Sequence, residues 1–574
     1  MKKTILTLSI FFIHFLHAQS PLTTFEKSSG KQTVTYSDCI KFYHALSASF
    51  GSLKITKKNI TDAGLPLHLL IYSSDKQFDP SKWHQQGKIV MLINNGIHPG
   101  EPDGIDASMM LLRDACTGAI KVPPNVVLAV IPIYNIGGSL NRNTYSRVNQ
   151  DGPESYGFRG NAQNLDLNRD FIKCDSRNAI AFTQIFHEVN PDIFLDNHVS
   201  DGADYQYTMT LLTTQHDKLG GEVGKFLHDE FEPALYKGMN KKNMLMTPYV
   251  NFEDGNMQKG WTAFYDAPRY STGYATLFQT ISFMSETHML KPFKDRVLST
   301  YALMQTMIEE ASKYADKIIA TRKASIEDVK KQMEFALSWK PDTARFDMIR
   351  FKGYTGDSIV SAVTGMKRLF YNHEKPFETA VKFYNYLNPV NVTTKAKAYI
   401  IPQGWHNVTD LLALNGVKMQ QLKTDTTIEV EAYRIEDYKS YPKPFEKHHR
   451  NYDVKLATSK QSLQFRQGDY LIYTGQATDR YIVETLEPQS DDSFFSWNFF
   501  DAILQQKEGY SDYRWEDVAA KYIAAHPEVK QLLNEKKQKD SVFAASAKEQ
   551  LRFVYTHSPY YEPAHLRYPV YKIN

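Results

Sequence analysis

The stretch KIVMLINNGIHPGEPDGIDASMMLLRD, residues 88 to 114, joins an apolar run to a run with helical spacing through one short corner. The run before the corner is rich in β-branched and apolar residues, as in a buried strand, and apolar side chains recur at helical intervals after Pro102. His98 and Glu101 stand in the corner. Because the carboxyl ends of strands in open α/β sheets line the crevice where ligands bind, this corner is a candidate functional site.

Strand-like and helix-like runs continue to alternate from about residue 33 to residue 323. The further strand-like runs are 65–73, 125–135, 192–198, 203–212 and 281–288, and the helix-like runs are 103–114, 176–189, 219–232 and 295–323. This alternation predicts an α/β fold with a mixed, mostly parallel sheet flanked by helices. After about residue 345 the pattern changes, with a strand–helix–strand run at 396–422, and predicts a smaller α/β or α+β accessory domain.

The length and composition limit the class of protein. A chain of 574 residues exceeds what one hydrophobic core usually supports, so we expect a domain at 30–323, a helical bridge at 324–344 and an accessory domain of unknown role at 345–574. The aromatic run at 490–504 is expected to form a hydrophobic core helix rather than a ligand platform. The 67 basic and 64 acidic side chains give a net charge of +3, which provides no electrostatic footprint for nucleic acid.

The first residues resemble a secretory signal. Two lysines precede an apolar stretch from Ile5 to Leu16, and Ala18 is a suitable residue for cleavage, so residues 1–18 are predicted to be a signal peptide. The stretch is shorter than a membrane-spanning helix requires, and no later segment approaches that length without charges, so no stable membrane insertion is expected. We therefore expect an exported protein, periplasmic or secreted. Its three cysteines are too few for a disulfide framework and permit one bridge at most.

A second histidine completes a candidate metal site. The strand-like run PDIFLDNH, residues 191 to 198, ends in His198, so its side chain is expected at the same edge of the sheet as the corner. Catalytic zinc commonly has three protein ligands of the histidine and carboxylate type and keeps a fourth position for water. His98, Glu101 and His198 form such a set. Each alone has a structural alternative, because a His-x-x-Glu spacing arises by chance and a lone histidine is often a core residue.

Four features together resemble the zinc metallocarboxypeptidases related to carboxypeptidase A. They are the HPGE corner, the distant His198, the arrangement R-x-N-x-x-x-x-D-x-N-R within 159–169, and the run ISFMSETH, in which Glu286 follows a strand. The resemblance covers roughly residues 30 to 320. It implies the zinc carboxypeptidase-like fold and one zinc ion (Zn²⁺) per chain.

The resemblance also implies a role for each matching residue. Arg159 would polarise the scissile carbonyl and stabilise the oxyanion, Asn168 and Arg169 would hold the terminal carboxylate of the substrate, and Asp166 would orient the first zinc histidine. Glu286 would be the catalytic glutamate. General chemistry supports these roles, because a carboxylate that is not a ligand can take the proton of a zinc-bound water and a guanidinium binds a carboxylate with two parallel hydrogen bonds.

The match is incomplete at two places. The family carries a tyrosine in a mobile loop before the catalytic glutamate, and TAFYDAPRYSTGYATL, residues 262 to 277, offers Tyr265, Tyr270 and Tyr274. Tyr265 and Tyr270 are both kept as substrate-binding candidates, and Arg269 in the same loop is a candidate for binding an acidic terminal residue, although a loop arginine is more often a solvated charge. Two further residues, Arg142 and Arg147, compete with Arg159 for the oxyanion role.

The sequence therefore predicts an exported zinc-dependent carboxypeptidase that hydrolyses the C-terminal bond of peptides, with a zinc-bound water and Glu286 as general base. Its partner would be a peptide or other small substrate with a free carboxylate. One alternative is a zinc amidase acting on N-acyl amino acids or peptidoglycan stem peptides. Another is a non-catalytic protein that binds a peptide or glycan on the same fold, although a pure binder does not need Glu286.

Overall fold

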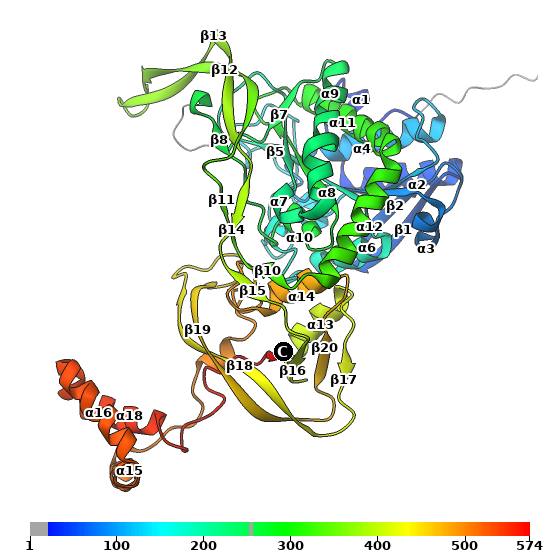
Figure 1. Ribbon diagram of the computed structural model, residues 1–574. Helices are drawn as coiled ribbons and strands as arrows, with labels where there is room; N and C mark the ends of the chain where they lie inside the picture. The colour runs from blue at the N-terminus through cyan, green and yellow to red at the C-terminus, as the bar shows by residue number, and fades with distance from the viewer. Residues whose placement is uncertain (1–20, 252–256) are drawn as a thin grey trace, which may run out of the picture.

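The computed structural model describes residues 21–251 and 257–574. The predicted signal peptide at 1–18 lies outside the described residues. Figure 1 shows an N-terminal α/β region, a long two-stranded hairpin that projects from it, a second sheet-containing region below, and a small helical group at the side of that region. In the described part of the chain, no helix combines the length and the apolar character needed to cross a membrane.

The N-terminal region is built on an eight-stranded mixed sheet with the order β1-β2-β4-β3-β5-β9-β6-β7. Its centre is parallel, since β4, β3, β5 and β9 run in the same direction, while β1, β2 and β6 pair antiparallel to their inner neighbours. The bounds are β1 Leu53–Ile60, β2 Pro66–Tyr72, β3 Ile89–Asn95, β4 Val126–Ile131, β5 Ile193–Ser200, β6 Met209–Thr213, β7 Met246–Pro248 and β9 Ile281–His288. The predicted mixed, mostly parallel sheet is confirmed.

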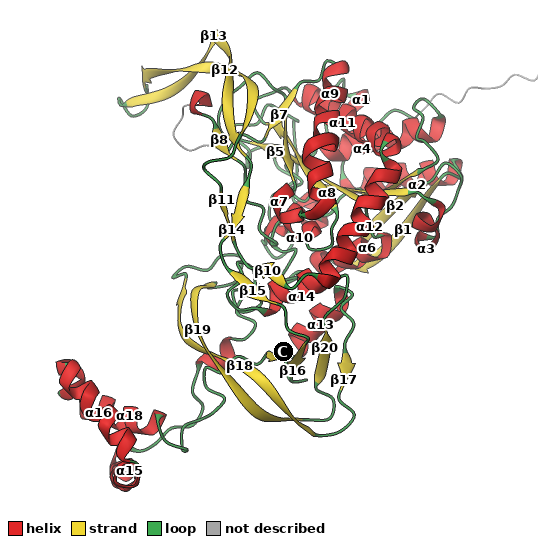
Figure 2. Cartoon of the chain, viewed as in Figure 1, coloured by secondary structure: helices red, strands yellow, loops and turns green. Residues whose placement is uncertain are grey.

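Helices cover both faces of this sheet, as Figure 2 shows in red. Alternate residues of β3 divide between two cores, because successive side chains of a strand point to opposite faces. Ile89, Met91 and Ile93 pack with α2 (Tyr36–Ser49), α4 (Asp103–Thr117) and α11 (Phe293–Lys313). On the other face, Val90 and Leu92 pack with α6 (Arg177–Val189) and with side chains from the C-terminal region. The second core is therefore shared between the two halves of the chain.

The C-terminal half begins within a helix. Helix α12 (Ala315–Lys331) runs through the predicted start of the bridge and ends at the short strand β10 (Glu334–Ala336). The strands β12 (Asp347–Val360) and β13 (Lys367–Tyr384) form the projecting hairpin. A six-stranded sheet follows, with the order β17-β20-β16-β21-β18-β19, flanked by α13 (His406–Leu414) and α14 (Asp479–Leu486). Its strands are β16 Ala398–Ile401, β17 Gln420–Gln421, β18 Thr426–Ser440, β19 Asn451–Phe465, β20 Tyr470–Tyr473 and β21 Tyr571–Ile573.

The remaining helices form the small group seen in Figure 1. They are α15 Asp512–Ala525, α16 Pro527–Lys539, α17 Ser541–Ala544 and α18 Ala547–Thr556. They have a small core of their own, in which Trp515, Leu533 and Tyr555 are buried. This group is an addition to the predicted α/β or α+β accessory domain.

Two local predictions need correction. The run 203–212 is a strand only from Met209 to Thr213, because the residues before it form a loop that packs on the hairpin through Tyr205 and Tyr207. The aromatic run at 490–504 is buried as expected, but it consists of turns followed by a 3₁₀-helix at Asp501–Leu504 rather than a core helix. Its aromatic rings pack from turns onto the shared second core. The three cysteines, all within the described residues, are free thiols.

A buried carboxyl group on α4, that of Asp106, makes the stability of the fold sensitive to pH. Burial raises the pKa of Asp106 to about 7, although a hydrogen bond from the Thr33 hydroxyl opposes the rise. Between pH 4 and 7 the folded chain therefore holds a proton that the unfolded chain releases, so the free energy of unfolding falls as pH rises through this window. Above pH 7 Asp106 is ionised in both states, and the free energy of unfolding stays lower than at pH 4 by roughly 4 kcal/mol at most.

We expect Asp106→Asn to remove this pH dependence, because the amide carries no charge at any pH. Thermal unfolding of the variant at pH 8 should occur at a higher temperature than that of the wild type. The difference between the two unfolding temperatures should become smaller as the pH is lowered to 4. A wild-type unfolding temperature that rises between pH 4 and 7 by as much as that of the variant would contradict the assignment.

Candidate active site

The predicted corner lies at the carboxyl end of the central strand β3, and the chain turns there into α4. The amide of Glu101 donates to the carbonyl of His98 at 2.8 Å, which closes the corner, and α4 begins at Asp103. A Cβ atom on Gly100 would lie 2.7 Å from Cδ of Arg147, so glycine allows this arginine to pack against the turn. His198 lies near the end of the neighbouring strand β5, in register with Glu286 on β9. The three strand ends therefore meet at one edge.

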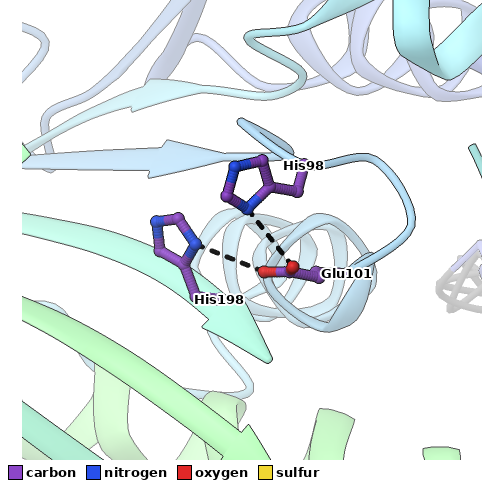
Figure 3. A group of neighbouring side chains, drawn as sticks. All are labelled: His98, Glu101 and His198. Carbon is purple, nitrogen blue, oxygen red and sulfur yellow. Dashed lines mark hydrogen bonds and ion pairs between the residues drawn. The ribbon is translucent and has the colours of Figure 1, made fainter. Parts of the chain in front are cut away.

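His98, Glu101 and His198 converge, and one ligand atom from each lies within 4.8 Å of the others. Figure 3 shows both imidazole rings directed at the carboxylate of Glu101. The distances are 3.2 Å from Nδ1 of His98 to Oε1 of Glu101 and 3.2 Å from Nδ1 of His198 to Oε2. All three side chains are buried.

The donor set fits a zinc ion. Among the described residues, Nδ1 of His98 is a buried atom without a hydrogen-bond partner, although it faces the carboxylate. On each histidine the opposite nitrogen Nε2 meets a carboxylate, Asp166 at 2.8 Å for His98 and Asp196 at 2.9 Å for His198. Carboxylates that hold the outer nitrogen of a metal-binding histidine fix its tautomer and ring orientation. Both Nδ1 atoms are thereby directed toward a common point with one carboxylate, which is a combination that zinc accepts.

Asp196 is a site residue that the sequence reasoning missed. It precedes His198 by two positions on β5, so both side chains leave the strand on the same face. The burial of Asp196 is complete, and its charge and hydrogen bond raise the pKa of His198 well above the usual range against the opposing effect of burial. The spacing Asp-x-His at the end of a buried strand was the signal in the sequence.

We expect Asp196→Asn to weaken zinc binding by 10- to 100-fold, because the amide no longer fixes the ring of His198 through a charged acceptor. The dissociation constant, measured by competition with a chromogenic chelator, checks this. Asp192→Asn is a useful control, since Asp192 is a buried carboxylate at the opposite end of the same strand, bound to Arg322 and His84. Equal zinc affinity in Asp196→Asn and the wild type would contradict the role.

Glu286 lines the same cleft without joining the ligand group. It lies on β9 and is almost fully buried. Burial raises the pKa of Glu286 to about 8, while the nearby His198 lowers it and Glu101 raises it. A carboxyl group whose proton affinity is moved toward neutral pH beside a candidate metal site has the properties of a group that accepts and returns protons.

Two arginines approach the ligand group from the cleft. Arg147 binds Oε1 of Glu101 at 2.9 Å and is held further by Oε1 of Gln150 and the carbonyl of Val199. Arg159 binds Oδ2 of Asp166 at 2.9 Å through Nε and NH2, while its NH1 lies 3.6 Å from Glu101. The Arg159 side chain is 45% exposed, against 13% for Arg147. Arg142, the third candidate, is directed at the carbonyls of Thr33, Val34 and Ser155 instead.

The predicted substrate-binding pair also lines the cleft, which has a volume of about 550 Å³. Arg169 lies over the ring of Tyr270, with 4.6 Å between its guanidinium carbon and the ring centroid. Asn168 is buried beneath them, and its Oδ1 lies 3.5 Å from the amide of Ser271. Arg169, Asn168 and Tyr270 therefore form one group on the wall of the cleft.

The structure does not bring Tyr265 and Arg269 into this cleft. The Tyr265 hydroxyl donates to Asp491 at 2.5 Å, and the Arg269 guanidinium is paired with Asp492 at 2.9 Å. Both carboxylates belong to the C-terminal half. Tyr274 is fully buried in the second core and binds Asn415. Among the loop tyrosines that the sequence offered, Tyr270 is the one placed at the cleft.

The site as a whole has the composition of a metal-dependent hydrolase: a histidine–glutamate–histidine group, a nearby carboxyl group with a raised pKa, and arginines around a cleft. Curated proteins related to this chain are carboxypeptidases. Carboxypeptidase 2 of Trichophyton rubrum is 23% identical over 455 residues, which span 75% of this chain and 77% of the relative. Carboxypeptidase 2 of Trichophyton equinum is 22% identical, over 71% of this chain and 74% of the relative. The resemblance that the motifs indicated is confirmed.

Two carboxypeptidases are among the solved structures with local similarity to this chain. A metallo-carboxypeptidase from Burkholderia cenocepacia is 15% identical with a TM-score of 0.37, covering 49% of this chain and 70% of that chain. Carboxypeptidase A from Helicoverpa armigera is 14% identical with a TM-score of 0.37, covering 50% of this chain and 74% of that chain. No family model matches the chain.

Proposed function

We propose that the protein is an exported zinc-dependent carboxypeptidase that removes C-terminal residues from peptides. The observation that carries the proposal is the convergence of His98, Glu101 and His198 beside Glu286 in one cleft. The relationship to carboxypeptidases supports it. The proposal that the protein is exported rests on the N-terminal sequence. The division into a catalytic domain at 30–323, a helical bridge at 324–344 and an accessory domain at 345–574 is also part of the proposal.

In peptide hydrolysis each of these residues would have its own role. His98, Glu101 and His198 would hold the zinc ion, which when bound supplies Lewis acidity to the reacting water and carbonyl. Glu286 would take a proton from the attacking water and deliver it to the leaving amine. Arg159 would donate to the oxygen that becomes negative, and Arg169 with Asn168 would bind the terminal carboxylate of the peptide.

The floor of the cleft indicates an apolar terminal residue. Leu212 on β6 and Met284 on β9 are direct cross-strand partners, both are buried, and both line the cleft. Phe264 and Tyr249 lie on its wall. Since Arg269 is neutralised by Asp492 outside this cleft, it offers no charge to an acidic side chain. We therefore propose that peptides ending in phenylalanine, leucine or tyrosine are the better substrates.

We expect kcat/KM for a phenylalanine-ended peptide to exceed that for the same peptide ending in aspartate or lysine by at least tenfold, because a charged side chain would lose its hydration on this floor. Leu212→Asp should reverse the order of the phenylalanine-ended and lysine-ended peptides. Leu245→Asp, at an exposed leucine that does not line the cleft, is the matched control. An unchanged order in Leu212→Asp would refute the placement of this pocket.

The function is tested by metal analysis and cleavage on one purified sample. We expect one zinc ion per chain and stepwise loss of C-terminal residues from a mixed peptide library, followed by mass spectrometry. A chelator should abolish cleavage and added zinc should restore it. Bound zinc with cleavage of acylated amino acids or cell-wall stem peptides, but of no ordinary peptide, would replace the carboxypeptidase with an amidase.

A further inference from the structure

The segment that carries Tyr270 is held by residues of the C-terminal half that do not line the cleft. Asp492, which is fully buried, accepts from the Arg269 amide at 2.8 Å and from its Nε at 3.1 Å. The same carboxylate accepts from Nε1 of Trp497 at 3.1 Å and pairs with Arg450 at 3.2 Å. Its position is therefore fixed by partners in its own half, and the Arg269 backbone is fixed to it one residue before Tyr270.

A second attachment lies four residues earlier. The Tyr265 hydroxyl donates to Asp491, the neighbour of Asp492, at 2.5 Å. On the N-terminal side, Lys218 pairs with Asp266 at 2.8 Å. The segment 263–270 is thus held at Tyr265 and at Arg269 by adjacent carboxylates of one loop. Tyr270, at its end, presents its ring to Arg169 and lies 5.1 Å from the ring of Phe264, and both of these partners line the cleft.

A third attachment reaches the wall of the cleft at Asp166. Oε2 of Glu446, in the C-terminal half, accepts from the Asp166 amide at 2.9 Å. Asp166 is the residue that binds His98 and Arg159, and Arg169 follows it by three positions. Nearby, His448 pairs with Asp175 at 2.8 Å, so this contact is part of a wider junction.

These three attachments share one feature: each joins a carboxylate of the C-terminal half to a segment that carries a proposed substrate-binding residue. Hydrogen bonds to charged groups in a partly buried junction are stronger than those between neutral groups and restrict motion of the attached backbone. A side chain that must meet the carboxylate of a substrate needs such restriction, because small displacements of a positioning residue are costly.

We propose that Glu446, Asp491 and Asp492 are positioning residues for the cleft, which we call the carboxylate clamp. They act through Tyr265, Arg269 and Asp166, and they set the positions of Tyr270 and Arg169. The role of the C-terminal half is then to complete the wall that binds the end of the substrate. This inference rests on the proposed carboxypeptidase function for its kinetic consequence, but the restriction of the segment 263–270 stands independently of it.

The test uses two mild substitutions in the full-length zinc-loaded protein. Tyr265→Phe removes the bond to Asp491 and keeps the ring, and Glu446→Ala removes the acceptor of the Asp166 amide at a half-buried position. Glu446→Gln keeps an oxygen acceptor but not its charge, so its KM should lie between that of wild type and that of Glu446→Ala. The matched controls are Tyr301→Phe, which removes a tyrosine–Asp114 bond, and Glu562→Ala, which removes acceptors of the Lys507 and Glu508 amides.

Two measurements decide the outcome. The first is hydrogen exchange of the Arg269 amide, which should be at least tenfold faster in Tyr265→Phe than in wild type and unchanged in Tyr301→Phe. The second is steady-state kinetics on a phenylalanine-ended peptide. KM should rise at least fivefold in Tyr265→Phe and Glu446→Ala, while kcat stays within twofold of wild type. Both variants should keep one zinc ion per chain. The control variants Tyr301→Phe and Glu562→Ala should show wild-type KM and kcat.

A role confined to stability would lower the active fraction, and so reduce apparent kcat while leaving KM unchanged. That result, or unchanged exchange at Arg269, overturns the proposal. If the wild type cleaves no peptide, the proposed function fails, and the exchange measurement still decides whether the carboxylate clamp holds the segment.

Discussion

Replacing Glu286 with glutamine is expected to lower kcat by about a thousandfold, within the range of 10² to 10⁴ that general acid–base catalysis contributes. Glutamine has nearly the same size and can accept hydrogen bonds, but it cannot take up and return a proton. Zinc content should stay at one ion per chain, because Glu286 lies outside the ligand group. KM should change little, since the residues proposed to bind the substrate carboxylate lie elsewhere on the cleft wall.

Glu232→Gln is the matched control for this experiment. Glu232 is another carboxyl group whose pKa is raised by burial, and it binds the Thr213 hydroxyl away from the cleft. Its variant should retain wild-type kcat. Full activity in Glu286→Gln would exclude Glu286 as the general base, whereas loss of zinc together with activity would assign it to the metal instead.

The sequence predicted the fold in the regions where periodicity is strong. The apolar run at Ile89–Asn95 and the helical spacing after Asp103 correspond to β3 and α4 within a few residues, and the parallel centre of the sheet follows from the alternation of such runs. Periodicity cannot describe the run 490–504 correctly, because its aromatic side chains are buried by tertiary contacts while the backbone follows turns. Burial and secondary structure are separate properties of such a segment.

The candidate site was predictable where its residues are tied to strand ends. His98, Glu101, His198 and Glu286 follow β3 or lie on β5 and β9, so adjacency of the strands brings them together. Tyr265 and Arg269 were not placed correctly by sequence, because their partners Asp491 and Asp492 are more than 200 residues away along the chain. Their charge and type suited a cleft, but the interface with the C-terminal half determines their position.

The choice between Arg147 and Arg159 for the oxyanion role depends on which guanidinium can exchange a contact with the protein for a hydrogen bond to the substrate. Arg147 donates to Glu101, Gln150 and Val199, so each of its three guanidinium nitrogens already has an acceptor within the protein. Arg159 is half exposed, and its NH1 has a weaker contact at 3.6 Å. We therefore expect Arg159→Gln to lower kcat by 10²- to 10³-fold, or about 2.7 to 4 kcal/mol, with zinc retained.

Arg147→Gln is expected to act differently, because it releases the carboxylate of Glu101 that Arg147 orients. Zinc should therefore bind more weakly to this variant. Once saturated with zinc, the variant should keep kcat within tenfold of wild type. Kinetics at saturating zinc, beside a zinc titration of both variants, separate these effects, since a metal ligand's orientation is restored by excess metal and a missing oxyanion donor is not. If Arg147→Gln loses a hundredfold or more in kcat at full zinc occupancy while Arg159→Gln does not, the oxyanion role belongs to Arg147. Arg159 would then serve to hold Asp166, and through it His98.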